Sequence, residues 1–333
     1  MAIPHSLGLK AGDWVFVREP AEILSTLDQD GCLDRLPFMP EMLRHCGNRY
    51  RVRAVAHKTC DTIEGSGGRR MHDTVHLEDL RCDGSAHGGC EAGCTLFWKE
   101  AWLRRDAPTS AAHPPVAAKL EVLERACTRP GSTIGDPTWR CQTTDLLAAS
   151  EPLRPAQIGQ YVRDVTTGNH GVLDILRLLA LAGYERLVGL GVGYRVWVGL
   201  YNAWQGLRGG KPWPAVTGRV TAGTTTPAEV LDLKARERGR GGPGGGRGDT
   251  SNAQGFNRGM RFDVEMVKYC DAEYTVQSRV TKIINEKTGK MMHMSNPCIL
   301  LEDVYCRAEC TPGRRGCPRA VNTYWREIWL RRV

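Results

Sequence analysis

The chain carries the same module twice, and this repeat limits its fold more than any other feature of the sequence. Residues 9–11 (Leu-Lys-Ala) return as residues 233–235, and residues 77–79 (Leu-Glu-Asp) return as 301–303, both at an offset of 224. After a three-residue insertion in the second copy, residues 98–105 return as residues 325–332, and both tryptophans are retained. Chance does not keep one register over about seventy positions. The chain therefore contains two copies of a module of roughly 100 residues, an ordinary domain size.

The first copy, residues 9–105, has the strand signals of a small β-barrel. Strands are predicted at residues 13–18, 50–55, 73–77 and 98–104, where apolar and polar residues mostly alternate. A short helix is expected over 21–27. Short strands with glycine-rich turns and one inserted helix predict a small, partly open barrel. The opening residues 9–15 (Leu-Lys-Ala-Gly-Asp-Trp-Val) resemble the first strand of SH3-like and KOW-type barrels.

The segment 106–227 between the copies predicts a helical middle domain. Helices are expected over 116–127, from Leu146, from Pro155 to Asp164, over 171–184 and over 187–204. The last two segments are strongly apolar, yet each contains charged residues. Neither gives the roughly 20 consecutive apolar residues of a membrane span, so we expect buried helices and disfavour a peripheral membrane contact.

The second copy, residues 232–333, departs from the first in its opening third. Residues 239–248 read Gly-Arg-Gly-Gly-Pro-Gly-Gly-Gly-Arg-Gly. Such a run has few core-forming side chains and high backbone entropy, which predicts a mobile loop. The fold class is therefore predicted as α+β, with two pseudo-symmetric SH3-like small β-barrels joined by a helical middle domain.

Thirteen cysteines dominate the chemistry that the chain could perform. The first ten residues lack an apolar core followed by a cleavage site, so we expect no signal peptide and a cytoplasmic location. In that reducing compartment cysteines serve as ligands or buried thiols more often than as disulfides, and an odd number cannot pair completely. The net charge of +8 permits a nucleic-acid partner without requiring one.

Each copy concentrates four cysteines around its Leu-Glu-Asp strand and the following loop. The two sets are Cys60, Cys82, Cys90 and Cys94, and Cys298, Cys306, Cys310 and Cys317. Four thiolates suit a tetrahedral zinc ion or a 4Fe–4S cluster. Both copies offer Cys-x-x-x-Cys instead of the Cys-x-x-Cys knuckle typical of zinc ribbons, and a larger cluster accepts wider spacing. We therefore predict two 4Fe–4S clusters, with two structural zinc ions or unliganded thiols as the alternatives.

Two histidines near the first set are the candidate catalytic residues. His57 lies three residues before Cys60, and His87 lies in the polar, glycine-rich loop between Cys82 and Cys90. His87 is expected to donate a hydrogen bond to a sulfur or to substrate, with metal ligation as the alternative. Cys46 and Cys270 occupy matching positions and are predicted to be buried thiols. Spacing assigns no role to the remaining cysteines, which are Cys32, Cys127 and Cys141.

The loop 82–87 (Cys-Asp-Gly-Ser-Ala-His) resembles the Cys-Asp-Gly-Ser-His signature of small 2Fe–2S proteins. In that family the cysteine and the histidine both bind iron, which the resemblance implies for Cys82 and His87. Here Ala86 is inserted before the histidine, and the family's upstream Cys-x-Cys pair is absent. The resemblance therefore supports iron–sulfur chemistry without supplying that family's full ligand set.

The whole chain resembles a family of uncharacterised bacterial proteins found near biosynthetic gene clusters. The segments that carry the resemblance are 36–42, 57–62, 82–94, 284–290, 296–298 and 324–327. Membership would imply a role in specialised metabolism but no particular reaction. The glycine-rich stretch 239–248 departs from the family pattern.

Two functions remain open from the sequence. The first is an iron–sulfur enzyme or redox partner, with the cluster of the first copy beside His57 and His87 meeting a small-molecule substrate or a redox partner protein. The second is a zinc-stabilised module that binds RNA or protein without catalysis. Its basic residues stand in pairs at 69–70, 104–105, 314–315 and 331–332. Base-stacking aromatic residues are not interleaved with them, so we rank this function second.

Overall fold

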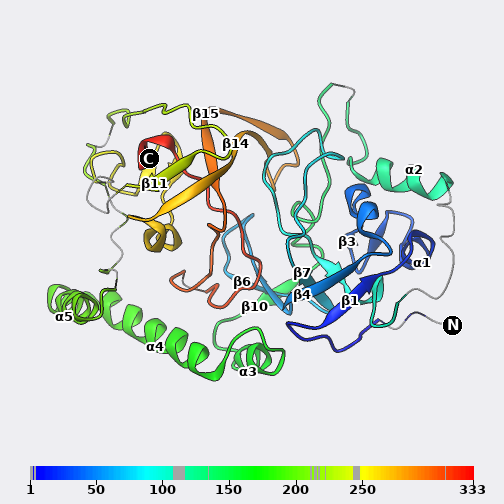
Figure 1. The fold of residues 1–333 in the computed structure, drawn as a ribbon, viewed down its shortest axis with the longest axis horizontal. Coiled ribbons are helices and arrows are strands. Elements are labelled where there is room, and N and C mark those ends of the chain that lie inside the picture. Colours follow the sequence, from blue (N-terminus) through cyan, green and yellow to red (C-terminus); the bar gives the residue numbers. More distant parts are fainter. Residues whose placement is uncertain are drawn as a thin grey trace. The chain divides into compact units, whose positions relative to one another are not determined.

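The chain folds as a mixed α+β protein with more strand segments than helices (Figure 1). The computed structural model describes residues 3, 5–107, 117–133, 135–210, 212–213, 216, 218–221, 223–242, 248–311 and 313–333. The α-helices are α1 (Pro20–Thr26), α2 (Ala117–Ala126), α3 (Gly159–Thr166), α4 (Val172–Gly189) and α5 (Tyr194–Leu207). The 3-10 helices are η1 (Pro40–His45), η2 (Glu100–Trp102), η3 (Val264–Tyr269) and η4 (Glu327–Trp329).

The strands divide between the two copies and a short stretch of the middle segment. The first copy contains β1 (Trp14–Val17), β2 (Cys32–Leu33), β3 (Leu36–Pro37), β4 (Arg49–Val55), β5 (Lys58–Cys60), β6 (Gly68–Arg70), β7 (Thr74–Leu77), β8 (Trp98–Lys99) and β9 (Leu103–Arg104). The middle segment contains β10 (Glu151–Leu153). The second copy contains β11 (Arg238–Gly241), β12 (Phe256–Asn257), β13 (Met260–Arg261), β14 (Glu273–Ile284), β15 (Met291–Leu301) and β16 (Leu330–Arg332).

Two compact units make up the chain. The first comprises residues 1–175, 282–293 and 316–320, and the second comprises residues 176–281, 294–315 and 321–333. The boundary falls inside α4, so the segment 106–227 is divided between the units. A separate helical middle domain is therefore not confirmed.

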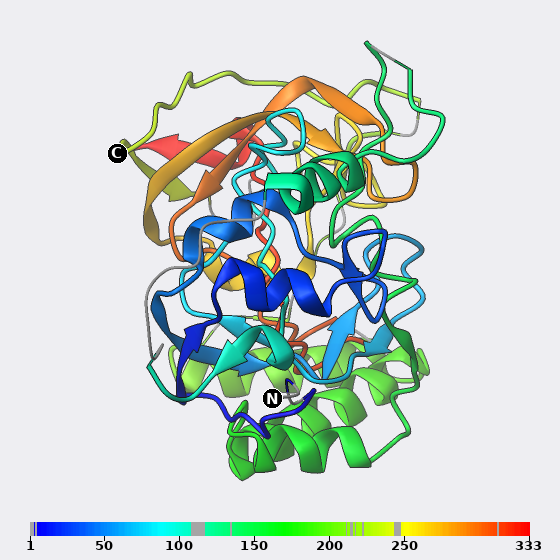
Figure 2. The same ribbon diagram turned by 90° about the vertical axis from the view of Figure 1, so that its right-hand side faces the viewer.

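The first unit is built on a five-stranded antiparallel sheet with the order β8-β7-β4-β1-β9. Its β1 alternates as the sequence predicts, because Val15 and Val17 are fully buried while Trp14 is half exposed. The aromatic centre of the core is Phe38, whose ring meets Trp98 and Trp102 edge-on at 6.2 and 5.1 Å between centroids. The helices α1 and α2 of this unit are drawn in blue and blue-green in Figure 2.

A second, three-stranded sheet in the first unit has the order β10-β6-β5. It recruits β10 from the middle segment, where the sequence predicted only helices. Arg69 of β6 is buried and donates to the carbonyl oxygens of Leu147 and Ser150. The stretch from Leu146, expected to be helical, consists of turns held by this arginine instead.

The second unit repeats the main sheet and the 3-10 helices of the first, whereas α1 has no helical counterpart among its described residues. Its sheet has the order β15-β14-β11-β16, and β11 and η3 lie 224 residues after β1 and η1. Phe262 meets Trp325 and Trp329 edge-on, as its counterpart Phe38 meets the first pair of tryptophans. Trp325 bridges to Ile299 just as Trp98 pairs with Val75. Equivalent residues of the two copies therefore make equivalent strand pairs.

The glycine-rich stretch of the second copy is not simply a loop, which corrects the sequence expectation. Its first residues, 239–241, form most of β11 and pair with β14 and β16. A Cβ atom at Gly241 would lie 2.9 Å from the Tyr269 carbonyl oxygen, closer than real Cβ atoms approach. Glycine here permits close backbone contact inside a sheet. Residues 243–247 lie outside the described residues.

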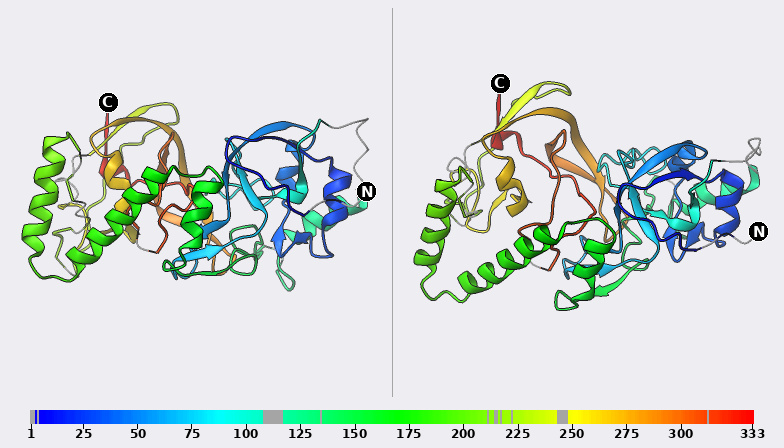
Figure 3. Two further views of the ribbon diagram at one scale, coloured as in Figure 1. Left: turned by 90° about the horizontal axis from the view of Figure 1, so that it is seen from below. Right: turned by 60° about the horizontal axis from the view of Figure 1, so that its bottom comes forward.

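The helices α4 and α5 are more exposed than the sequence predicts. They are joined through residues 190–193, and Figure 3 shows them as two successive green rods. Leu173, Leu176 and Leu200 are each more than half exposed. The buried residues of α4 are Ile175, Leu178 and Val188, and α5 has none, so the expected burial holds for part of α4 alone. Within the described part of the chain, none of the helices combines the length and the apolar character that crossing a membrane requires.

Candidate metal centre

The candidate site lies in the first unit, where two segments distant in sequence meet. Glu41 is in the first turn of η1, and Cys82 and His87 lie in the loop that follows β7. Gly84 makes this loop possible: it has a φ of +70°, and a Cβ atom there would lie 2.0 Å from the Cys90 carbonyl oxygen. The tight turn at glycine folds the loop back on itself and carries His87 toward η1.

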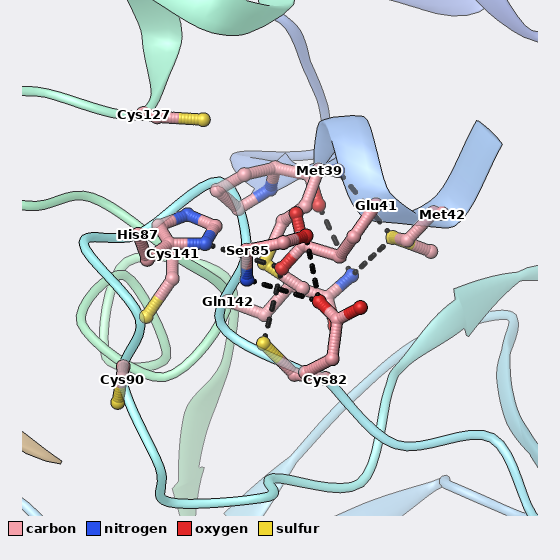
Figure 4. Close-up of polar contacts among 12 residues, drawn as sticks. Met39, Glu41, Met42, Cys82, Ser85, His87, Cys90, Cys127, Cys141 and Gln142 are labelled. Atoms are coloured by element: carbon pink, nitrogen blue, oxygen red, sulfur yellow. Dashed lines mark hydrogen bonds and ion pairs between the residues drawn. The ribbon is translucent and has the colours of Figure 1, made fainter. Parts of the chain in front are cut away.

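The Glu41 carboxylate lies between a thiol and an imidazole ring (Figure 4). Its Oε1 is 3.0 Å from the Cys82 Sγ and 3.1 Å from the His87 Nδ1. The other ring nitrogen of His87, Nε2, is 2.9 Å from the Arg140 carbonyl oxygen. The side chains of Glu41 and His87 are almost completely buried.

The contacts of His87 define which ring nitrogen carries a proton. A carbonyl oxygen only accepts hydrogen bonds, so Nε2 must be the protonated nitrogen. In the neutral ring, Nδ1 then directs its lone pair at the Glu41 carboxylate, which is unfavourable without a proton or a cation between them. A histidine that donates one N–H to a backbone carbonyl and offers the other nitrogen is the usual arrangement of a metal ligand.

Burial and neighbouring groups shift the pKa values of Glu41 and Cys82 in opposite directions. Burial acts to raise the pKa of Glu41, but the hydrogen bond and charge of His87 and the hydrogen bond of Cys82 outweigh it and lower that pKa. Burial and the neighbouring Glu41 raise the pKa of the Cys82 thiol far above its usual range. Glu41 Oε2 is buried without a hydrogen-bond partner. A bound cation would offset the negative charge of Glu41 and displace the thiol proton.

The three ligand atoms are close enough to share one ion. One oxygen, one sulfur and one nitrogen lie within 4.8 Å of one another, and among the described residues this is the one such group of His, Cys, Asp and Glu side chains. Zinc accepts all three atom types. Three protein ligands with a fourth position left for water or substrate is the pattern of catalytic zinc sites.

A pocket adjoins the group and is lined by further thiols. The space in it that water-sized molecules can occupy is about 30 Å³, and its lining includes Cys82, His87, Cys90, Cys94 and Cys141. Burial raises the pKa of Cys94 to about 12 and also raises that of Cys141. These two thiols are therefore protonated at neutral pH unless a metal replaces the proton.

The structure unites only part of the first predicted cysteine set. Cys82, Cys90 and Cys94 line the pocket, but Cys60, in β5, does not. Next to Cys60 lies the buried guanidinium of Arg319, which donates to the Cys60 carbonyl and the Thr62 hydroxyl. Cys60 thus belongs to the surroundings of a buried arginine.

The two histidines predicted to be catalytic have different surroundings. His87 belongs to the pocket, as described above. His57 is buried elsewhere in the first unit, with its Nε2 2.9 Å from Asp164, a carboxylate that also binds Lys58. Burial lowers the pKa of His57 despite Asp164, and His57 is not among the pocket-lining residues.

The second predicted set is divided between the two units. Cys298, Cys306 and Cys310 belong to the second unit, and Cys317 belongs to the first. The Cys310 backbone N–H donates to Glu265, and Cys298 lies against two methionines. None of the thirteen cysteines forms a disulfide.

Glu265 is the counterpart of Glu41 in the second copy, and its partners differ. Its Oε1 accepts hydrogen bonds from the Cys310 and Thr311 backbone N–H groups and from the Thr311 hydroxyl. As in Glu41, Oε2 is buried without a partner. The two glutamates therefore differ in the partners of Oε1. In the first copy these are a thiol and an imidazole, and in the second they are backbone N–H groups and a hydroxyl.

Sequence reasoning missed two residues of the site, Glu41 and Cys141. Glu41 carried a signal, since the Glu-Met pair at 41–42 returns at 265–266. Cys141 carried none, because it has no counterpart at the repeat offset. Of the predicted structural thiols, Cys270 is buried and Cys46 is half-buried. Cys32 is buried and accepts a hydrogen bond from Arg140, and buried Cys127 donates to Leu123.

Comparison with known proteins gave no match to a family model, to a curated protein or to a solved structure.

Proposed function

We propose that the first unit binds a divalent transition metal, zinc by its donor set, through Glu41, Cys82 and His87. The observation that carries the proposal is the convergence of a carboxylate, a thiol and an imidazole nitrogen within 4.8 Å at a buried place beside a pocket. The ion would serve as a Lewis acid for a small-molecule substrate, with one coordination position open.

The protein's own groups have distinct tasks in this proposal. The Arg140 carbonyl fixes the His87 tautomer so that Nδ1 is free to bind the ion. The Cys82 thiol gives up its proton when the metal binds, and Glu41 supplies a negative oxygen ligand. The thiols of Cys90, Cys94 and Cys141 line the small pocket beside the proposed ion.

A second candidate is an iron–sulfur cluster in the same pocket. One observation favours it: four cysteines, Cys82, Cys90, Cys94 and Cys141, line a single pocket. A cubane holds its four cysteine sulfurs further apart than a single ion does, and the pocket supplies the four thiolates that it needs. This ligand set replaces Cys60 of the sequence prediction with Cys141. The proposal does not extend to the second copy, whose four cysteines are divided between the units.

Finer structural and biological assignments also remain proposals. An SH3-like barrel in each copy is supported by antiparallel order and by the return of the last strand beside the first, β9 beside β1 and β16 beside β11. A role in bacterial specialised metabolism rests on the sequence resemblance alone. Binding of RNA or protein by a zinc-stabilised module is the non-enzymatic rival, and a gel-shift titration at low salt tests its nucleic-acid form.

Metal analysis of protein purified without oxygen tests both metal proposals. The zinc proposal predicts one zinc ion per chain in addition to any other metal. It also predicts that protein loaded with Co²⁺ in place of zinc shows a thiolate-to-metal absorption band. Glu41→Gln and His87→Thr should each weaken metal binding at least about tenfold, because loss of even an outer partner costs that much. His87→Thr introduces a threonine like Thr311, the residue that contacts the equivalent glutamate.

The duplicated module supplies matched controls. Glu265→Gln and Cys306→Ser change the counterparts of Glu41 and Cys82 and should leave zinc binding at the first unit unchanged. Cys141→Ser separates the two candidates, because it should spare the zinc site and destroy an iron–sulfur cluster. The protein could instead contain iron and an equal amount of sulfide. If Cys141→Ser lost both and His87→Thr retained them, the assignment of the site would change from zinc to an iron–sulfur cluster. A folded protein that binds neither metal would exclude both.

A further inference from the structure

Three sulfur atoms meet in the second unit, at a place that the proposed zinc site does not involve. The Cys298 Sγ lies 3.6 Å from the Met260 Sδ and 3.6 Å from the Met294 Sδ. Met294 and Cys298 lie on β15, four residues apart and therefore on the same face of the strand. Met260 comes from β13. Cys298 is completely buried, and both methionines are partly buried.

The distance from the cysteine sulfur to each methionine sulfur fits a shared bound ion. A metal about 2.3 Å from each of two sulfurs, the usual Zn–S distance, allows those sulfurs to be up to about 4.6 Å apart. Both distances from the cysteine are shorter than this limit. An ion could therefore contact the thiolate and either thioether without a large movement of the backbone.

The fold itself does not require sulfur at these positions, as the first copy demonstrates. The residues 224 positions earlier are Leu36, Arg70 and Thr74, none of which contains sulfur. All three sulfur-bearing positions thus differ between two copies that share their strand pairing. The convergence is a property of the second copy and not of the module.

The neighbouring arginine has a structural task that both copies share. Arg326 donates to the Arg258 and Asn296 carbonyl groups. Its counterpart Lys99 binds Asp34 and the His72 carbonyl, at the residues that match those two partners. Arg326 also lies with its Nη1 3.3 Å from the Cys298 Sγ, where it can donate to a coordinated thiolate.

We propose that Cys298, Met260 and Met294 form a binding site for Cu(I). Thioether sulfur is a soft ligand that selects Cu(I), whereas zinc prefers thiolate, imidazole and carboxylate. One thiolate and two thioethers carry a single negative charge, and the neighbouring Arg326 guanidinium adds one positive charge. A monovalent ion therefore adds less positive charge to this buried site than a divalent ion would. The site thus differs in ligand type and ion charge from the Glu41 site of the first unit.

Binding exchanges one proton for one copper ion. Burial, partly opposed by the Arg326 charge, raises the pKa of Cys298 to about 11, so the thiol is protonated at neutral pH. Cu(I) forms a bond to sulfur, the S–H bond breaks and the proton leaves to solvent. Copper remains Cu(I) throughout, so the step needs neither an oxidant nor a reductant.

The test uses full-length protein labelled with ¹³C at the methionine methyl groups. Cu(I) is added without oxygen, buffered by a chromophoric Cu(I) chelator, so that site affinity and methyl resonances are read together. We expect the Met260 and Met294 methyl resonances to shift on addition of one equivalent. Their double variant Met260→Leu/Met294→Leu should weaken the tightest Cu(I) site at least about tenfold, as should Cys298→Thr.

The controls separate this site from the other twelve cysteines. Met291→Leu/Met292→Leu changes two methionines on the same strand and should leave the affinity unchanged. Zn²⁺ should leave the Met260 and Met294 resonances in place. Cys298→Thr introduces the residue found at the matching position, Thr74, which favours correct folding. Cu(I) uptake that moves neither methyl resonance, or equal affinity in the double methionine variant, would assign copper to other thiols and overturn the proposal.

Discussion

The two copies differ more in individual side chains and their contacts than in the pairing of their strands. Glu41 and Glu265 start equivalent 3-10 helices and are both buried, yet one meets a thiol and an imidazole and the other meets backbone N–H groups. His76 is a further example. It is completely buried, its Nδ1 is 2.9 Å from the Leu96 carbonyl oxygen and its Nε2 has no partner, whereas the second copy has Leu300 there.

His76 should make the stability of the protein depend on pH. Burial, aided by the charge of Arg53, lowers its pKa well below the usual value. Because the unfolded chain takes up this proton near pH 6.5 and the folded chain does not, stability is retained above that pH and falls below it. His76→Leu should reduce the loss of unfolding free energy between pH 7 and 5.5 by about 1 kcal/mol, measured by urea unfolding. An unchanged pH dependence would contradict this role of His76.

At the level of elements, β11 shows how a strand forms where side chains predict none. Gly239 and Gly241 both lie in this strand, but only the second is pressed against other backbone. A Cβ atom at Gly241 would lie 2.9 Å from the Tyr269 oxygen, whereas one at Gly239 would meet nothing closer than 3.8 Å. The strand therefore depends on glycine at one position and tolerates it at the other.

The two glycines provide a matched pair of variants. Gly241→Ala should lower the free energy of unfolding by about 1–3 kcal/mol, the usual cost of forced overpacking. Gly239→Ala should be neutral or stabilising by up to about 1 kcal/mol, since alanine loses less backbone entropy in a strand. Denaturant unfolding of both proteins measures the difference. Equal effects would show that close backbone contact does not define this strand.

At the level of the whole molecule, each unit has its own hydrophobic core. Phe38 with its two tryptophans lies in the first core, and Phe262 with its pair lies in the second. Because the two cores share no residue, we expect each to be stabilised separately. The two phenylalanines, both almost completely buried, are equivalent probes of this independence.

Phe38→Ala and Phe262→Ala should each remove about 3–5 kcal/mol from the unit that contains the change. Hydrogen exchange read by mass spectrometry should then detect faster exchange in β1, β4 and β7 for the first variant and in β11 and β14 for the second. If either variant accelerated exchange equally in both sets of strands, the units would unfold as one cooperative body.

The sequence by itself determined the duplication and the principal strands of the first copy. Repeated residues such as Trp98 and Trp325 keep the same spacing in both copies. Strand periodicity and core positions produce local sequence patterns, so both can be recognised from the sequence alone. The loop from Cys82 to Cys94 was recognisable for the same reason: its glycines and polar residues stand next to its cysteines in sequence. These local signals also identified His87.

Tertiary structure alone decided which of these residues meet. Glu41 reaches His87 because η1 packs against a loop some forty residues away, and Cys141 replaces Cys60 at the pocket because a turn from the middle segment closes on it. Residue spacing reveals ligand types but not the packing of distant segments. A metal ligand set requires atoms within a few ångströms, and only the packed core fixes positions that finely.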